Sequence, residues 1–293
     1  MIRLSLVIPA KSKDDPKLAE LLRSIEAQDF PKEEMEVLVI TEGTSESAKA
    51  IGIRKAKGEV IGILASDNEL TTPIFLSTMY HFASESGAAY PERYSHIKGD
   101  DLLNRYFALI GGNDPLAFYM RKNDKWSYSG DLNLPSNNLS HGDNGFFVKR
   151  EFIINTDLNN YYHIDNANEI DVRPRPISLD IWHKTGGNIF SFFRKRYRYG
   201  LQHAFNPNRR WHLVDFRQPK DIVRLIWFII ITLTGIQPIL LSIRGYLKIK
   251  DLAWFMHWIV CLMTFFTYTL LMTHLVLRKL FQSLFAPTVA PSR

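Results

Sequence analysis

Two long apolar stretches near the carboxyl end set the main limits on how this chain folds. Residues 225–243 and 252–277 contain no Asp, Glu, Lys or Arg. About 20 apolar residues in a helix can cross the roughly 30 Å hydrocarbon layer of a membrane. We therefore predict transmembrane helices over residues 221–244 and 252–277, followed by a short tail, 278–293. The alternative is a buried helical pair or one interfacial hairpin, because Pro238 interrupts the first stretch.

A basic block precedes the first apolar stretch. Between residues 194 and 224 there are nine Lys or Arg and two Asp, whereas all 293 residues together carry a net charge of +6. Basic residues mark the cytoplasmic flank of a span and attract anionic lipids. We therefore expect residues 206–220 to be a basic juxtamembrane linker of an integral protein of the plasma membrane, with the amino-terminal domain in the cytoplasm. No nucleic-acid-binding motif accompanies the block, so nucleic acid is not an expected partner.

The rest of the chain has room for one domain of about 200 residues. Its first part alternates between strand and helix patterns. Strands are predicted at residues 4–9, 36–40 and 60–65, and a helix capped by Asp14 or Asp15 begins at Pro16. A second helix ends near Gly58. This β-α-β-α-β order predicts a parallel sheet with right-handed crossovers.

Several classes of protein are excluded. No Gly-x-Gly-x-x-Gly follows the first strand and no Walker loop occurs, which argues against a dinucleotide dehydrogenase and a P-loop enzyme. Cys261 is the only cysteine, so one chain can form neither a disulfide nor a cysteine-based metal site.

Asp67 follows the third predicted strand directly. Ligands of open α/β sheets collect beyond the carboxyl ends of the strands, so a carboxylate there can reach a substrate or its metal ion. The alternative role for Asp67 is to cap the turn at the end of the strand.

The order of several segments resembles glycosyltransferase family 2, which has the GT-A fold. The resemblance covers roughly residues 1–205, and no single motif carries it. The segments are VIPA at 7–10, LRSIEAQ at 22–28 with FP at 30–31, EVLVI at 36–40, KAKGE at 55–59, ASD at 65–67, GDNGFFVKR at 142–150, IWH at 181–183 and FRKRYRYG at 193–200.

This resemblance implies an α/β GT-A domain, a mostly parallel sheet with flanking helices, over residues 1–205. It also implies an inverting, hexosyltransferase-type enzyme of polysaccharide or glycolipid biosynthesis that uses a nucleotide-diphosphate sugar. The membrane stretches and the basic block favour a membrane-associated acceptor, either a polyprenyl-linked glycan or a polyprenyl phosphate. The family's Asp-x-Asp motif implies Mg²⁺ or Mn²⁺, held here by Asp67 with help from His183; a purely structural role for His183 is the alternative.

The remaining site residues also follow from the resemblance. The nucleotide sugar is expected to contact Pro9, Ala10, Glu42, Arg54 and Ser66 beside Asp67. The diphosphate or a lipid phosphate is expected to contact Arg194, Arg196 and Arg198, because guanidinium groups match phosphate oxygens; these residues are otherwise membrane-flank charge. Asp165 is the first candidate for the base that deprotonates the acceptor, followed by Glu169 and Asp171.

Two departures from the family pattern keep other functions open. Ala65 stands where the family has the first acid of Asp-x-Asp, and Thr41-Glu42 stands where it often has paired acids. One alternative is therefore a non-catalytic membrane protein that binds sugar nucleotides. The other is a tethered glycosyltransferase that builds polysaccharide on a non-lipid acceptor.

Overall fold

A seven-stranded mixed sheet organises the amino-terminal part of the chain. The computed structural model describes residues 1–123, 125–130, 144–156, 170, 172–185, 188–203 and 213–285. Across the sheet the strands follow the order β2-β1-β3-β6-β5-β7-β4. Their bounds are β1 Leu4–Pro9, β2 Met35–Ile40, β3 Val60–Leu64, β4 Asn68–Leu70, β5 Ala88–Tyr94, β6 Asn144–Lys149 and β7 Arg175–His183.

Most of these strands run in one direction. β1 pairs in parallel with both β2 and β3, and β5 pairs in parallel with β7. β6 runs antiparallel between β3 and β5, and β4 runs antiparallel along β7. The expected α/β sheet is therefore confirmed, with β6 and β4 as its reversed strands. The carboxyl ends of β1, β2, β3 and β7 consequently lie along one edge.

Local signals explain the first helices. Asp15 caps α1, Pro16–Glu26, by accepting a bond from the Lys17 N–H, and Pro16 occupies its first turn. Thr44 and Ser47 form a capping box at the start of α2, Ser45–Lys55. Gly58 follows α2 where a Cβ would lie 2.6 Å from the Ser5 backbone nitrogen, so only glycine fits beside β1.

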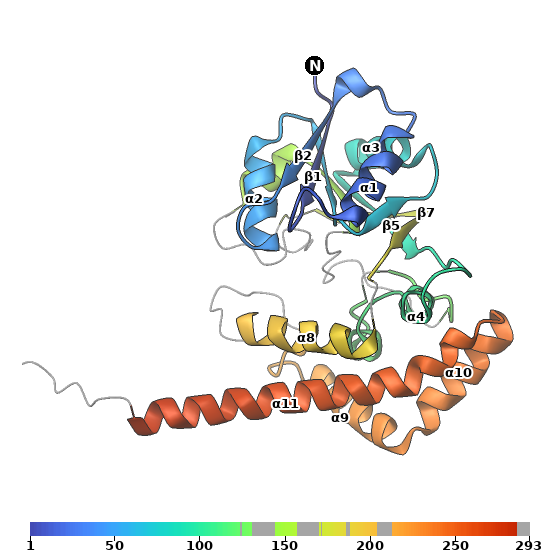
Figure 1. Cartoon of the computed structure of the whole chain (residues 1–293), viewed down its shortest axis with the longest axis vertical. Helices are drawn as coiled ribbons and strands as arrows, with labels where there is room; N and C mark the ends of the chain where they lie inside the picture. The colour runs from blue at the N-terminus through green and yellow to red at the C-terminus, as the bar shows by residue number, and fades with distance from the viewer. Residues whose placement is uncertain are drawn as a thin grey trace, which may run out of the picture.

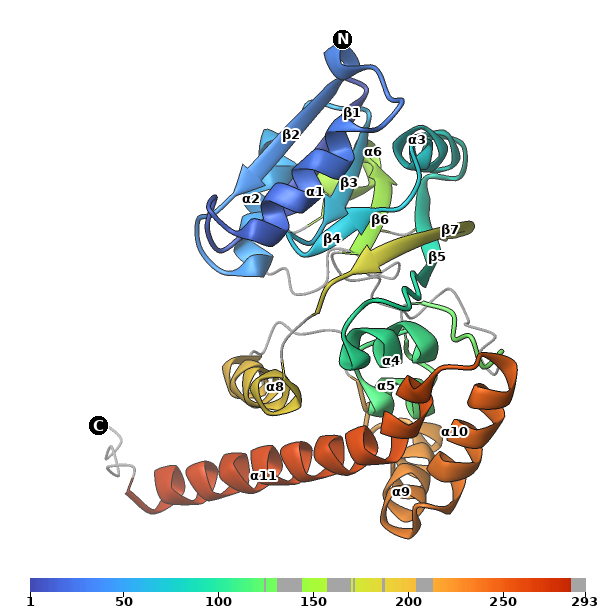
Figure 2. The same cartoon turned by 45° about the vertical axis from the view of Figure 1, so that its right-hand side comes forward.

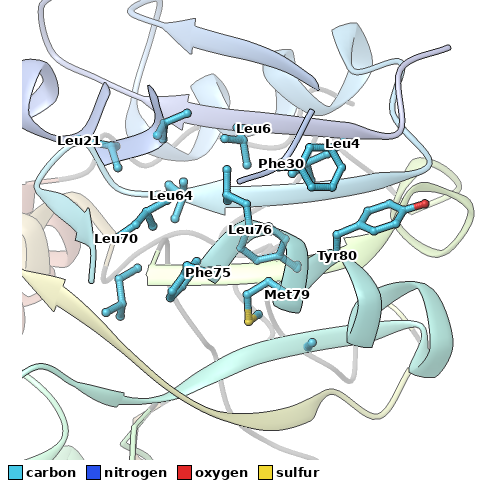
Figure 3. Close-up of a cluster of buried hydrophobic side chains, with 14 of the residues drawn as sticks. Leu4, Leu6, Leu21, Phe30, Leu64, Leu70, Phe75, Leu76, Met79 and Tyr80 are labelled. Carbon is cyan, nitrogen blue, oxygen red and sulfur yellow. The ribbon is translucent and has the colours of Figure 1, made fainter. Parts of the chain in front are cut away.

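Helices cover both faces of the sheet (Figures 1 and 2). α1 and α3, Phe75–Ser86, pack on one face; α2 and α6, Arg150–Ile154, pack on the other. Side chains of β1 alternate between the two cores, with Leu4, Leu6 and Ile8 in the first and Val7 in the second. Figure 3 shows the first core, where leucines of the sheet meet aromatic and aliphatic side chains of α3.

A helical layer lies below the carboxyl edge of the sheet (Figure 1). Its helices are α4 Leu102–Ile110, α5 Pro115–Met120, α8 Ile189–His203, α9 Pro219–Thr234, α10 Ile236–Lys248 and α11 Met256–Phe285. Two short 3-10 segments complete the described elements, η1 Lys32–Glu34 beside the sheet and η2 Leu252–Phe255 before α11. Aromatic and aliphatic side chains join α4, α5, α8, α10 and α11 into a further core.

The apolar stretches form one long helix and one elbow. Residues 252–281, which include most of α11, form the one described helix long and apolar enough to cross a membrane. α9 and α10 replace the predicted helix over 221–244, and they meet at a bend of 81°. A second candidate span therefore exists only if this pair is taken as one broken helix. Gly235 causes the bend because it adopts a left-handed conformation, φ 72°, that ends α9.

Candidate functional site

A tight turn presents Asp67 at the carboxyl end of β3. The Asn68 N–H donates to the Ala65 carbonyl oxygen at 3.0 Å, and the Asn68 side-chain oxygen accepts from the Ala65 N–H at 2.9 Å. The Asp67 carbonyl oxygen in turn accepts from the Lys184 N–H, just beyond β7, at 2.8 Å. The turn is thus held from both sides, and the Asp67 side chain is partly exposed at the edge of the sheet.

His183 lies next to Asp67 although the two are 116 positions apart in the sequence. The pairing of β4 with β7 sets Asn68 opposite His183, and the His183 Nε2 lies 3.5 Å from the Asp67 Oδ1. Burial alone raises the pKa of the Asp67 carboxyl, but His183 and then Lys17 and Lys195 outweigh it and bring the pKa to about 2. Asp67 is therefore ionised throughout the physiological pH range.

Two lysines that sequence reasoning did not select add positive charge to this edge. Lys17 lies in the first turn of α1, and its Nζ donates to the Lys184 carbonyl oxygen at 2.5 Å. Lys195 is an exposed residue of α8, but partial removal of water from its ammonium group lowers the pKa of that group, and attraction to Asp67 opposes the shift. Lys17 could have been found, because a helix that follows a parallel strand starts at the carboxyl edge. Lys195 belongs to the basic run on which only the arginines were selected.

A chain of buried polar groups supports the site from behind. The Asn68 Nδ2 donates to the Asn144 Oδ1 at 2.9 Å, and the Asn144 Nδ2 donates to the Tyr94 hydroxyl at 2.8 Å. The Tyr94 ring then packs on the His183 ring, with centroids 5.2 Å apart. Gly145, next in the chain, has φ 85°, and a Cβ there would lie 2.9 Å from Pro91. The network ties the turn of β3 to the end of β7.

Asp67 and His183 suit part of a metal site. A carboxylate that stays ionised and an imidazole nitrogen are ligands that Mn²⁺ and related ions accept. Across the residues described, no third His, Cys, Asp or Glu joins them in a group able to hold a metal ion. A cation held by these two side chains would need further oxygen ligands that the described His, Cys, Asp and Glu residues do not supply.

The other predicted nucleotide contacts divide between two edges. Pro9 ends β1, and the Ala10 N–H donates to the Ile40 carbonyl oxygen at 2.9 Å, so both lie at the Asp67 edge. Glu42 is exposed just beyond β2, and Ser66 is partly exposed in the Asp67 turn. Arg54 lies in the last turn of α2. Because α2 runs back from the carboxyl edge, Arg54 reaches the opposite edge of the sheet and does not share the site.

The three arginines of α8 divide between two sides of the helix. Arg194 and Arg198 are exposed. Arg196 forms an ion pair with Asp114 at the start of α5, and its Nη1 donates to the Tyr268 hydroxyl of α11 at 3.0 Å. Burial lowers the pKa of the Arg196 guanidinium, and Asp114 more than offsets this. Because these contacts occupy Arg196, they favour a structural role over a phosphate contact.

The predicted base cannot be located. Asp165, Glu169 and Asp171 all lie outside the residues that the structure describes.

Comparison with known proteins gives structural likeness only. No protein-family model matches the chain, and no curated protein matches it in sequence. Among solved structures, TarS 1-349 from S. aureus has 13% identity and a TM-score of 0.41, over 68% of this chain and 66% of that one. The mannosyltransferase PcManGT from Pyrobaculum calidifontis, in complex with GDP-Man and Mn²⁺, has 16% identity and a TM-score of 0.40, over 70% and 62%. TarS 1-349 in complex with UDP-GlcNAc has 14% identity and a TM-score of 0.39, over 70% and 68%. The chain spans slightly less than two thirds of the length of the first two of these structures.

Proposed function

We propose that this chain is a GT-A glycosyltransferase of family 2 that transfers a sugar from a nucleotide diphosphate to a membrane-associated acceptor. The observation that carries the proposal is the pair of Asp67 and His183, held 3.5 Å apart at the carboxyl edge of an α/β sheet. Ligands of such sheets bind at this edge. The order of sequence segments that resembles the family supports the same assignment.

The charges at this edge suit a nucleotide-diphosphate donor. Lys17 and Lys195 lie close enough to Asp67 to affect its pKa, and they can bind the diphosphate oxygens. Exposed Arg194 and Arg198 extend the positive surface of α8, and exposed Glu42 is proposed to accept hydrogen bonds from the base or ribose. Pro9, Ala10 and Ser66 would contribute backbone groups and a hydroxyl beside them.

Mg²⁺ or Mn²⁺ would be held by Asp67 and His183. When bound, the cation neutralises the negative charge that develops on the leaving diphosphate. Independently of the cation, Lys17 and Lys195 orient the same group. The network of Asn68, Asn144 and Tyr94 keeps His183 in register with the Asp67 turn.

The acceptor side of the reaction rests on the sequence. A single displacement with inversion needs a base to take the proton of the acceptor hydroxyl. Asp165 is proposed for this role, with Glu169 and Asp171 as alternatives. A polyprenyl phosphate or a polyprenyl-linked glycan is the proposed acceptor because the apolar helices would hold the enzyme at a membrane.

The test is transfer by the full-length protein with a panel of nucleotide sugars, with and without Mn²⁺. Asp67→Asn is expected to lower transfer at least a hundredfold, because it removes the anionic ligand while keeping the side-chain shape. Glu26→Gln is the matched control: it also removes one negative charge, at the exposed end of α1. Retained transfer by Asp67→Asn would contradict the assignment.

The same panel separates the alternative functions. Tight nucleotide binding without transfer to any acceptor would favour the non-catalytic sugar-nucleotide-binding protein, which Ala65 in place of a family acid keeps open. Equal transfer to a water-soluble glycan and to a lipid-linked one would favour the tethered polysaccharide enzyme. Preference for the lipid-linked acceptor supports the proposal.

A further inference from the structure

The carboxyl half of α11 lies against α8, which cannot enter hydrocarbon. A Cβ at Gly200 of α8 would lie 2.4 Å from the Leu271 side chain, so the two helices are in close contact there. The Tyr197 hydroxyl also lies 2.8 Å from the His274 Nδ1. α8 carries exposed Arg194, Lys195 and Arg198, and each charge would cost several kcal/mol at the centre of a bilayer. This half of α11 therefore lies at a water-facing surface.

The amino-terminal half of α11 is also attached to the globular part. His257 is buried, with its Nδ1 2.7 Å from the Tyr106 hydroxyl of α4 and its Nε2 2.8 Å from the Tyr119 hydroxyl of α5. Buried residues recur on one stripe from His257 to Leu275. At 1.5 Å per residue this stripe is about 27 Å long, close to the roughly 30 Å thickness of the hydrocarbon. The part of α11 that is long enough to cross a membrane therefore packs along the surface of the globular domain.

The opposite side of α11 is apolar and exposed. In both views α11 lies beneath α8, on the side of α8 away from the sheet (Figures 1 and 2). Its exposed large side chains are Ile259, Phe266, Leu270, Met272, Val276, Leu277, Leu280 and Phe281. An exposed apolar strip of this length, backed by a polar domain, fits a helix that lies in the membrane interface.

The bend between α9 and α10 lies below α11, on the side away from the sheet, and α10 rises from it beside the amino-terminal end of α11 (Figures 1 and 2). From Arg224 to Gly235 the first arm rises about 16 Å at 1.5 Å per residue, which is roughly half the hydrocarbon thickness. The 81° bend then turns the chain aside. Both arms expose apolar side chains, among them Trp227 and Ile230 on α9 and Leu240 on α10. Such an elbow can dip into one leaflet without crossing to the other.

A basic cavity opens between the arms of the elbow. Its volume is about 560 Å³, and it is lined by Arg121 of the α5 end, Arg224 of α9 and Arg244 of α10 together with Trp227 and other apolar residues. Arg224 and Arg244 lie on the parts of the arms remote from Gly235, where the elbow would meet the headgroups. Guanidinium groups beside apolar walls match a phosphate attached to acyl chains.

We propose that this protein docks on one leaflet of a bilayer and crosses it nowhere. α11 lies in the interface, the α9–α10 elbow enters the hydrocarbon, and Arg121, Arg224 and Arg244 hold the headgroup phosphate of an anionic phospholipid. This inference deepens the membrane attachment in the proposed function and does not depend on sugar transfer. It places the sheet, α8 and every charged end of the apolar helices on the same side.

Labelling of three introduced cysteines tests the topology. Lys220→Cys, Lys250→Cys and Lys279→Cys each replace an exposed residue, in the first turn of α9, after α10 and near the end of α11 respectively. Full-length variants in bacterial spheroplasts and in inverted vesicles are treated with an impermeant maleimide; the native chain, whose one cysteine is buried, gives the background. Labelling of all three in inverted vesicles alone is expected.

Each other pattern overturns the proposal in a distinct way. Opposite sidedness of the Lys250 variant alone would establish two spans, and opposite sidedness of the Lys279 variant alone would establish that α11 crosses. Neither result bears on sugar transfer, which is measured on the same variants, so failure of this inference and failure of the proposed function are distinguishable.

Vesicle flotation tests the arginine cavity. The double variant Arg224→Gln, Arg244→Gln is expected to bind phosphatidylglycerol vesicles about 25-fold less tightly than the native chain, at about fivefold per basic residue near the surface. Its binding to phosphatidylcholine vesicles should change little. The control, Lys55→Gln with Lys57→Gln, removes two exposed charges from the far edge of the sheet. An equal loss in the control would overturn the headgroup assignment.

Discussion

The ion pair of Arg196 with Asp114 is a sharp test of how α8 is positioned over the site. The side chains are 17% and 8% exposed, and the Tyr268 hydroxyl bonds both of them. Asp114 also caps α5 by accepting from the Leu116 N–H at 2.9 Å. One carboxylate therefore joins α8, α5 and α11.

Removal of either partner leaves a buried charge without its counter-ion. Loss of one member of such a pair typically costs about 3–5 kcal/mol, whereas replacement of both by apolar groups is often near neutral. We expect Arg196→Met and Asp114→Asn each to lower the free energy of unfolding by about 3 kcal/mol. Combined as Asp114→Leu, Arg196→Met, the changes should cost much less than the sum of the two single changes.

Chemical unfolding in detergent micelles measures these stabilities, and calorimetry with the nucleotide sugar measures the donor Kd. Donor affinity should fall with stability in the single variants, because a displaced α8 moves Lys195 away from Asp67. Arg194→Met is the matched control: this neighbour is exposed, so the free energy of unfolding should change by less than about 0.5 kcal/mol.

One result would refute the reasoning. If Arg196→Met were as stable as the native chain but lost donor affinity, Arg196 would be a phosphate ligand as its sequence context predicted. Additive costs in the double variant would likewise show that the pair does not act as a unit.

Three further perturbations follow from single positions. The pKa of the Asp67 carboxyl is about 2 in the fold against an ordinary 3.8. This lowered pKa adds about 2 kcal/mol to the free energy of unfolding above pH 3.8, and the contribution is lost as the pH falls through 2. When the native chain and Asp67→Asn are unfolded at pH values from 6 to 2, the difference between their free energies of unfolding should therefore shrink by about that amount. Gly62→Ala places a Cβ 2.7 Å from the Phe147 ring and should lower the free energy of unfolding by about 1–3 kcal/mol in denaturant titrations. The control is Gly99→Ala, which has open space around the new Cβ and should change the free energy of unfolding by less than about 0.5 kcal/mol. Gly235→Ala forces a side chain into the left-handed region and should lower the melting temperature through a cost of about 1–2 kcal/mol; an unchanged melt would contradict the bend.

Local patterns predicted the first half of the sheet well. Asp15, Pro16 and the apolar spacing of α1 are signals that a helix carries in its own sequence, and the structure begins α1 at Pro16. Asp67 was located because its strand is a short apolar run that ends at a turn. No such local signal joins Asp67 to His183, since their contact depends on the pairing of β4 with β7 across more than 100 residues.

The role of neighbouring residues on α8 depends on helix phase. Lys195 interacts electrostatically with Asp67, whereas Arg196, one position on, is turned toward α5 and α11. Composition shows only a basic run there. The rotation of α8 is decided by the partners of its other face, among them Leu271 at Gly200.

Sequence alone determined the alternating α/β order, the strand-end carboxylate and the presence of two apolar stretches, because each depends on neighbours along the chain. The family resemblance paired His183 with Asp67, whereas only the tertiary structure brought Lys17 and Lys195 to Asp67 and bent the first apolar stretch at Gly235. Hydropathy measures how apolar a helix is, but it does not show which side of the helix is already buried against the rest of the protein. The contacts of α11 with α4, α5 and α8 show which side of the helix is covered. They favour apolar helices that pack on the domain and face one leaflet over two transmembrane helices separate from the domain.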